Sequence, residues 1–381
     1  MQKPCLDSYS TQFLDIAHML DYHERLHEAS RWERCNVSSL CVKPLDKGSP
    51  LLSDMSAFAP FVTQEAIQDT AEQMGLALNS TAGLIPVRNT AGKSLMDRAK
   101  ISGSVLRKLD KAKLAGILND CMQVHKSSEA LVLIRDEKVS AVHSGDKHDY
   151  SILPAHELIH ALKNELDSRF PGNVFLSGYA DHTLTTATWA LPAQQKQLLG
   201  SYEKALAAHG YAHLASDMMP GIRFSTSDVG FAAASVSAII TSKQGSIRIG
   251  NVVTVEHRRQ SLVSDFASAL SQIYARYADV AKCLERLLDV ILVHPVNAMT
   301  SVCKRLALPK KASLEAIAMF EMAVGNNPAT AHDIYMAMQE IQYILRTSGA
   351  PESKLASIEE SVCRALTLRW EDHDLAKAVS F

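Results

Sequence analysis

The sequence has no long hydrophobic run, no closely paired cysteines and almost no net charge, and each absence excludes a class of protein. No stretch reaches the ~18 consecutive apolar residues that a membrane-spanning helix needs. The first residues also lack the basic stretch and apolar core of a secretory signal. The seven cysteines form no C-x-x-C pair of the kind found in zinc knuckles and redox motifs. We therefore expect a soluble protein of a reducing cytoplasm, without a membrane partner.

The composition is that of a folded protein. Of the 381 residues, 47% are hydrophobic, and 39 Lys+Arg nearly balance 41 Asp+Glu, for a formal net charge of -2. This balance excludes a disordered tail and a protein whose whole surface binds polyanions, such as a histone. The length suggests two or three domains, and the sequence shows neither an internal repeat nor a low-complexity segment.

The pattern of apolar residues predicts strands in the middle of the chain. Residues 130–135 and 139–143 are apolar runs separated by the polar residues 136–138, which is typical of a β-hairpin. A helix is expected to start near Pro154 and to extend to Arg169. Further strand-like runs follow, separated by turn signals: 174–176, 183–189, 222–228, 235–240 and 246–255.

Helical patterns predominate at both ends of the chain. Residues 1–125 show no long strand pattern, and beyond Arg259 apolar residues recur at the spacing of one helix face. Thr330 is suited to cap a helix over 331–345. The sequence thus predicts an α+β fold with a mixed or antiparallel sheet core and packed helices. We expect three regions: a mostly helical N-terminal region (1–125), an α+β core (126–260) and a helical C-terminal region (261–381).

One motif points to an enzyme. His156-Glu157-Leu158-Ile159-His160 matches H-E-x-x-H, in which two histidines one helical turn apart bind zinc and the glutamate acts as general base. A second match occurs at 23–27, and a chain with 15 histidines can produce such matches by chance. The extended signature of a metzincin also fails, because Lys163 and Leu166 occupy the positions of its glycine and third histidine.

Helix geometry favours a structural role for this segment. At about 100° per residue the apolar side chains of 155–166 cluster on one face, with His156 and His160 on its flank and Lys163 between them. A metal bound there would repel this lysine. We expect an amphipathic helix and no cofactor. The alternative is a zinc site built from His156, Glu157 and His160, with Asp181, His182 or Glu203 as the third ligand.

The near-neutral total hides an uneven distribution of charge. Residues 88–113, which we call the basic segment, contain eight Lys/Arg and two acidic residues. Two further stretches, 229–264 and 290–314, are also basic. The formal charge of the three stretches together is +13, and that of the rest of the chain is -15. Local positive charge can neutralise phosphates with release of counterions. The alternative is a solvated basic face without a ligand. The predicted nucleic-acid contacts are Arg88, Lys93, Arg98, Lys100, Arg107, Lys108, Lys111, Lys113, Arg248, Arg258 and Arg259.

Several short motifs of the middle and last thirds carry a family resemblance. They are 130–135, 150–153, 178–192, 224–230, 248–251, 255–258 and 330–335. Over about residues 130–375 the chain resembles the phage/plasmid-like family, a domain of unknown function found on prophages and plasmids. The resemblance implies a mobile-element protein of the bacterial cytoplasm. It carries over no reaction and no catalytic residue.

Two clusters within this region hold chemically active side chains, at 225–228 and 256–259. Both lie at the ends of predicted strands, where loop-borne functional sites are common. The structural alternative is that Asp228 caps a turn and that Glu256 pairs with a neighbouring arginine.

These observations favour a protein without enzymatic activity. Our leading expectation is a non-catalytic, nucleic-acid-associated accessory protein of a phage or plasmid, whose basic segment contacts DNA, single-stranded DNA included. The first alternative is a zinc-dependent hydrolase that uses the H-E-x-x-H motif. The second is a protein-interaction module that modulates host defence, with the C-terminal helices docking on a host protein. A homo-oligomer is compatible with each.

Overall fold

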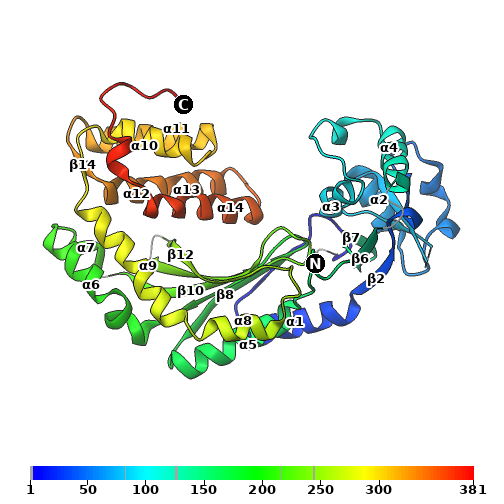
Figure 1. Ribbon diagram of the computed structural model, residues 1–381, viewed down its shortest axis with the longest axis horizontal. Helices are drawn as coiled ribbons and strands as arrows, with labels where there is room; N and C mark the ends of the chain where they lie inside the picture. The colour runs from blue at the N-terminus through cyan, green and yellow to red at the C-terminus, as the bar shows by residue number, and fades with distance from the viewer. Residues whose placement is uncertain (1–2, 82, 125–127, 216, 243–244) are drawn as a thin grey trace.

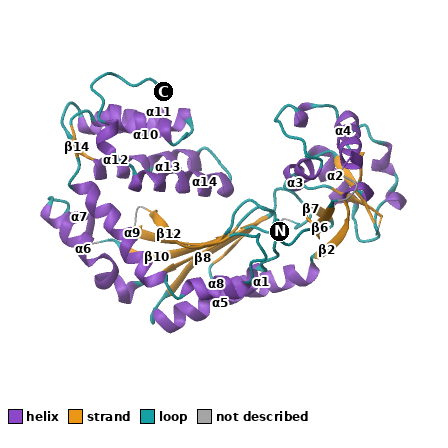
Figure 2. Ribbon diagram, in the orientation of Figure 1, coloured by secondary structure: helices purple, strands orange, loops and turns teal. Residues whose placement is uncertain are grey.

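The computed structural model describes residues 3–381, except 82, 125–127, 216 and 243–244. Its antiparallel sheets and many helices confirm the predicted α+β fold (Figures 1 and 2). The side chains form two hydrophobic cores. We call the residues around the first core the large lobe (10–29 and 150–381) and those around the second the small lobe (3–7 and 31–145).

The large lobe is built on a six-stranded antiparallel sheet. Along strand β10, Ile222 and Phe224 are fully buried, whereas Arg223 and Ser225 point to the opposite face and are partly exposed. This period of two divides the sheet into an apolar face and a polar face. The strands, in spatial order, are β1 (Ser10–Phe13), β8 (Val174–Asp181), β9 (Thr185–Ala190), β10 (Met219–Thr226), β11 (Ala234–Ser242) and β12 (Gly245–Val255).

Helices cover the apolar face of this sheet (Figure 1). On α5, Leu158, Ile159, Leu162 and Leu166 are all fully buried, which confirms the predicted amphipathic helix after Pro154. The covering helices are α1 (Ile16–Ala29), α5 (Ala155–Arg169), α6 (Gln195–Ala208), α8 (Val263–Leu270) and α9 (Ile273–Leu288).

The C-terminal helices lie on the other side of the sheet, above β12 (Figure 1). They are α10 (Pro295–Arg305), α11 (Lys310–Val324), α12 (Ala331–Met338), α13 (Glu340–Thr347) and α14 (Glu352–Cys363), with a short ladder of β13 (Ile291–Leu292) and β14 (Ala329–Thr330). Thr330 caps α12 as predicted, in a reciprocal capping box with Asp333. The predicted helix over 331–345 is divided at Gln339 into α12 and α13. The described helices are each too short or too polar to cross a bilayer.

The small lobe contains two three-stranded antiparallel sheets. One joins β2 (Arg31–Asn36) to the predicted hairpin of β6 (Glu129–Arg135) and β7 (Lys138–Ser144), so this hairpin does not belong to the large sheet. Asp136 and Glu137 form its two-residue turn with φ of 47° and 67°, as in a type I′ turn. The second sheet consists of β3 (Cys41–Pro44), β4 (Leu76–Ser80) and β5 (Gly83–Pro86). The α-helices of the small lobe are α2 (Gln64–Glu72), α3 (Ala91–Arg98) and α4 (Lys111–Val124). The short α7 (Ala212–Ala215) belongs to the large lobe.

A buried ion network fixes the start of the chain to the small lobe. The Asp7 carboxylate lies 3.4 Å from Nη1 of Arg88 and 3.0 Å from Nζ of Lys138, which also pairs with Asp69. Both cations are 0% exposed. Charges removed from water are stable only when partners replace their hydration, so the network depends on its two carboxylates.

Asp7→Ala tests this network. The substitution removes the carboxylate shared by Arg88 and Lys138, so we expect the free energy of unfolding to fall by about 3–5 kcal/mol. The control Asp21→Ala breaks the exposed pair with Arg25 on α1 and should cost less than about 1 kcal/mol. Urea unfolding monitored by circular dichroism measures both, and equal losses would contradict a stabilising role for the network.

Candidate functional site

The polar face of the large sheet carries two rows of hydrogen-bonding side chains. The antiparallel registers place the members of each row opposite one another on adjacent strands. Such alignment follows from the period of two along each strand. One row consists of Ser177, Thr188, Arg223, Ser237 and Asn251. The other consists of Gln12, Tyr179, Thr186, Ser225, Ser235 and Thr254.

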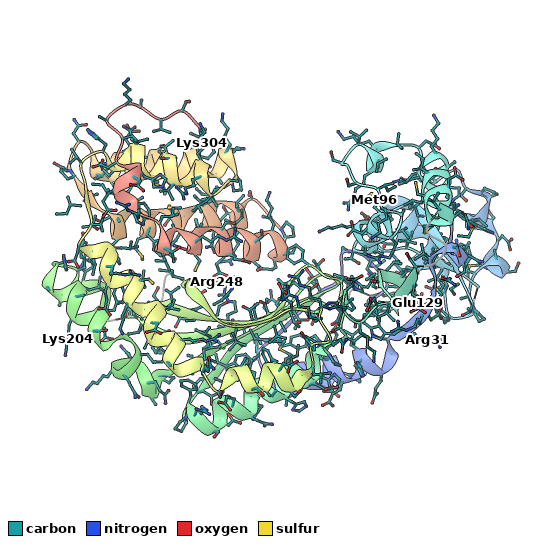
Figure 3. All side chains as sticks on the ribbon, viewed as in Figure 1. Arg31, Met96, Glu129, Lys204, Arg248 and Lys304 are labelled. Carbon is teal, nitrogen blue, oxygen red and sulfur yellow. The ribbon has the colours of Figure 1, made fainter. Side chains whose placement is uncertain are left out.

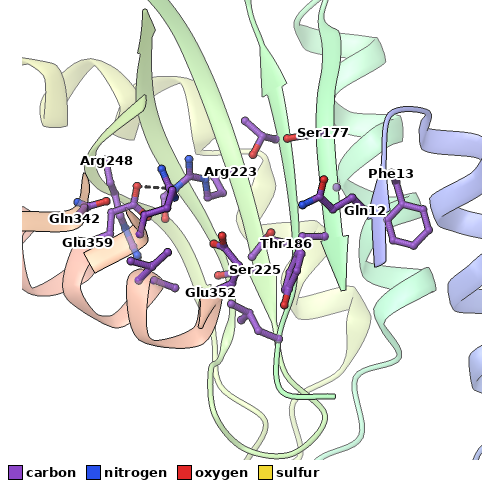
Figure 4. Close-up of a pocket in the computed structure, with 18 of the residues that line it drawn as sticks. Gln12, Phe13, Ser177, Thr186, Arg223, Ser225, Arg248, Gln342, Glu352 and Glu359 are labelled. Atoms are coloured by element: carbon purple, nitrogen blue, oxygen red, sulfur yellow. Dashed lines mark hydrogen bonds and ion pairs between the residues drawn. The ribbon is translucent and has the colours of Figure 1, made fainter. Parts of the chain in front are cut away.

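A cavity of about 250 Å³ lies between these rows and the helices α13 and α14 (Figure 4). Arg223 points from the sheet toward α14, where its Nη1 donates to Oε1 of Glu359 at 2.5 Å. Its Nη2 donates to the hydroxyl of Ser246. Glu359 is buried, so this charge-assisted contact fixes the helix to the floor of the cavity.

Arg248 of β12 lines the same cavity. It is 8% exposed, and its Nη2 donates to Oδ1 of Asn251, which also accepts from the hydroxyl of Ser237 at 2.9 Å. Within the described residues no carboxylate lies within ion-pair distance of its guanidinium. The structure thus places this predicted nucleic-acid contact inside the large lobe, apart from the basic segment.

Shared lining residues relate the cavity to a series of depressions that reaches the small lobe. The cavity shares Arg248 and Ala356 with a second depression, which shares Phe231 with a third. The third shares Asp149 with a fourth, beside the small lobe. We call this series of depressions the inter-lobe groove. The described residues that line its small-lobe end include three cations, Arg98, Lys100 and Lys147, and three carboxylates, Glu129, Asp146 and Asp149.

The two predicted loop clusters meet at the junction of the lobes. Oγ1 of Thr226 lies 3.1 Å from Nε2 of His257, so the ends of β10 and β12 are in contact. Asp228 follows β10, and its carboxylate accepts a hydrogen bond of 2.7 Å from Arg135 of the small lobe. The backbone carbonyl of Asp228 accepts hydrogen bonds from His143 and from the Tyr150 hydroxyl, each at 2.8 Å.

Burial governs the protonation of this junction. It lowers the pKa of His143 to about 4 and lowers the pKa of His257, and it raises the pKa of Tyr150. Burial also opposes ionisation of Asp228, but Arg135 outweighs burial and the pKa of this carboxyl is lowered. The rings of His143 and Tyr150 stack 3.6 Å apart. These groups are engaged with one another, which is the arrangement of a structural joint.

The basic segment is accessible except for Arg88. This arginine is fully buried in the ion network with Asp7, so it cannot contact DNA. The other seven cations lie on α3, on α4 and on the chain between them, and within the described residues none forms an ion pair. Five are exposed: Lys93, Lys100, Arg107, Lys108 and Lys113. Arg98 and Lys111 are partly exposed.

The remaining predicted contacts lie after β12. Arg258 forms an ion pair with Glu256, which confirms the structural alternative for that glutamate. Arg259 is exposed and adopts a positive φ of 61°, and its backbone N–H donates to the carbonyl of His148. Lys243, which contributes to the charge of 229–264, lies outside the described residues.

The two H-E-x-x-H matches face each other across α1 and α5. Nε2 of His160 lies 2.9 Å from Oε1 of Glu24, and the rings of His27 and His156 are 4.7 Å apart. Lys163 pairs with an aspartate one turn further along α5.

The suggested third ligands have other partners. His182 contacts the carbonyl of Leu6, the Asp181 carboxylate accepts from two backbone N–H groups, and Glu203 accepts from Gln195. Across the part of the chain that the structure describes, no three His, Cys, Asp or Glu side chains are arranged to hold a metal.

Sequence reasoning missed the residues that build the cavity. Arg223, Glu359 and Gln342 come from β10, α14 and α13, which are far apart in the chain. Only the alternation of polar and apolar residues at 223–226 and 235–240 could have indicated a polar sheet face.

Comparisons with protein-family models, with curated proteins and with solved structures found no match for this chain.

His143 provides a test of the junction by pH. Its folded pKa of about 4 lies below the value near 6.5 expected of an unfolded chain, so the unfolded state binds the proton first as the pH falls. The stability that neutral His143 contributes is therefore present above pH 6.5 and is lost as the pH falls toward 4. Titration of its imidazole C–H by NMR should show a midpoint near 4.

His143→Phe keeps a ring against Tyr150 but cannot titrate. We expect its free energy of unfolding to depend less steeply on pH between 6.5 and 4 than that of the wild type. A titration midpoint near 6.5 for folded His143 would contradict its burial in the joint. Equal slopes of the free energy of unfolding against pH for the two proteins would contradict it as well.

Proposed function

We propose that the protein binds DNA as a non-catalytic accessory protein, with the seven accessible cations of the basic segment contacting phosphates. The observation that carries this proposal is the absence of ion pairs for these seven among the described residues. Some helical cations elsewhere on the surface are paired with acids one turn away, as in Arg25–Asp21, Lys163–Asp167 and Arg364–Glu360. Others, such as Lys196 and Lys204, are unpaired within the described residues but do not stand in a cluster of seven.

Unpaired like charges on neighbouring elements repel one another and attract a polyanion. Only Asp97 and Asp110 lie among the seven cations in the sequence. The carboxylate of Asp110 accepts from the backbone N–H groups of Ala112 and Lys113 at the start of α4, so it is partly engaged there. The surface that remains is positively charged, and neutralising phosphates there would release counterions and stabilise a complex.

The chemistry of the segment favours contact with the DNA backbone rather than with bases. It contains no Phe, Tyr or Trp on which a base could stack. Lysines and arginines that reach phosphates position a strand without reading its sequence. Arg98 and Lys100 also line the small-lobe end of the inter-lobe groove, but Glu129, Asp146 and Asp149 line it too, so the proposed phosphate contacts are confined to the segment itself.

The biological setting rests on the family resemblance. Short motifs within about residues 130–375 resemble the phage/plasmid-like family, and although no family model matches the chain, this resemblance is the basis on which we propose a phage or plasmid origin. The accessory protein would then act on the DNA of that element or on the DNA of its host.

Charge reversal tests the proposal. For Lys108→Glu/Lys113→Glu we expect weaker DNA binding and a salt dependence, log K against log salt, that is shallower by roughly 1.4 for a single strand. Each lost phosphate contact accounts for half of this change. Fluorescence anisotropy of labelled oligonucleotides measures the affinity and its salt dependence between about 50 and 300 mM KCl, a range on the order of cellular ionic strength. The use of single- and double-stranded oligonucleotides shows which form of DNA the protein prefers.

The matched control is Lys196→Glu/Lys204→Glu on α6. Both lysines are exposed, and Lys204 lies at the end of the large lobe remote from the small lobe (Figure 3). We expect this variant to bind DNA nearly as tightly as the wild type. Absence of binding to either form of DNA at low salt, or equal losses in both variants, would refute the proposal.

A further inference from the structure

Arg248 is a buried cation whose partner is neutral. It is 8% exposed, it donates to the amide oxygen of Asn251, and no carboxylate of the described residues pairs with it. The other buried Lys and Arg side chains differ: Arg88 and Lys138 both pair with Asp7. The partly buried Arg135 also has a carboxylate partner, Asp228. Burying a charge without a counter-ion is costly, and an anion bound beside it would offset that cost. The isolation of Arg248 therefore indicates an anion site.

The surroundings of Arg248 offer an anion a second arginine. Arg346 of α13 lines the same cavity and also lacks an ion pair within the described residues. Arg223 lies in the same cavity but is already neutralised by Glu359 (Figure 4). The planar guanidinium group forms paired hydrogen bonds with phosphate oxygens. Glu352 also lines the cavity and offsets part of this charge. Two guanidinium groups without carboxylate partners nevertheless offer two forked sets of donors, which suit the oxygens of a phosphate better than those of a single carboxylate.

The rest of the cavity offers partners for hydroxyl groups. Its floor carries the hydroxyls of Ser177, Thr186, Thr188 and Ser225, and its walls add the side chains of Gln342 and Glu352. These groups can donate to and accept from a hydroxylated skeleton. The volume of about 250 Å³ is below the usual range for drug-sized ligands, so the occupant is a small molecule.

We propose that this cavity binds a small phosphate monoester with a hydroxylated carbon skeleton, a sugar phosphate or a mononucleotide, and that Arg248 and Arg346 hold its phosphate. The site lies in the large lobe, away from the basic segment, and does not depend on DNA binding. Either proposal can therefore fail while the other holds.

Isothermal titration calorimetry with four probes tests the ligand chemistry: ribose 5-phosphate, adenosine 5′-monophosphate, inorganic phosphate and gluconate. We expect both organic phosphates to bind at least about tenfold more tightly than gluconate, a hydroxylated carboxylate, and more tightly than inorganic phosphate. Tighter binding of the mononucleotide than of ribose 5-phosphate identifies a nucleotide, and similar affinities identify a sugar phosphate. Gluconate as the tightest ligand, or no heat from either organic phosphate at millimolar concentration, overturns the proposal.

Substitutions locate the site. Arg346→Ala changes an exposed side chain and should weaken binding of the better phosphate about tenfold. Arg248→Met should abolish measurable binding while leaving the melting temperature of the free protein unchanged or raised, since it removes an uncompensated charge. Arg369→Ala, at an exposed arginine outside the cavity, is the control and should retain wild-type affinity.

These outcomes separate a ligand site from a structural arginine. If Arg248→Met lowers the melting temperature and Arg346→Ala binds like the wild type, Arg248 serves the fold and the proposal is wrong. If Arg248→Met does not fold, the other two variants decide. Weaker binding of the phosphate by Arg346→Ala than by Arg369→Ala supports the proposal, and equal affinities overturn it. A 5′-phosphorylated oligonucleotide is a competitor that presents the end of a DNA strand to the cavity. If it displaces the bound small phosphate and binds at least as tightly, the cavity is a site for a strand end and the proposal of a small ligand is wrong.

Discussion

Alternation of side chains along the six-stranded sheet is the constraint on which the rest of the structure depends. Ile222 and Phe224 face the helices, so Arg223 and Ser225 must face the other way. Because the registers align across the strands, the hydroxyl and guanidinium groups form continuous rows instead of isolated contacts. A slip of one residue would bury these rows beneath α5, α8 and α9 and expose the core. The polar face is thereby left to line the cavity beneath α13 and α14.

The joint between the lobes extends this polar surface. Asp228 leaves the end of β10 and binds Arg135 of the small lobe, while His143 and Tyr150 donate to its carbonyl. These contacts link the hairpin of the small lobe to the sheet of the large lobe. They hold the two lobes together where two neighbouring depressions share the lining residue Asp149. Of the chemically active residues at 225–228 and 256–259, Thr226, Asp228 and His257 are used in this joint.

Local patterns predicted local structure well. The hairpin turn at Asp136, the helix after Pro154 and the Thr330 cap depend on residues close together in the sequence, and all three are present. The strands before residue 125 were missed because each spans only four to six residues, too few for a clear alternation. A count of charged residues along the sequence cannot distinguish Arg88 from Arg248, and both were predicted to contact nucleic acid. Only the fold shows that Arg88 meets Asp7, 81 positions away, and that Arg248 meets no carboxylate in the described chain.

The central claim is that clusters of cations without acidic partners, rather than single unpaired cations, mark the binding surfaces of this protein. The basic segment is the largest such group, and amide hydrogen exchange tests it most directly, with and without a saturating single-stranded oligonucleotide. We predict that DNA slows exchange in residues 91–113 and leaves α6 unchanged. Unchanged exchange in 91–113, together with protection of the C-terminal helices, would contradict the claim.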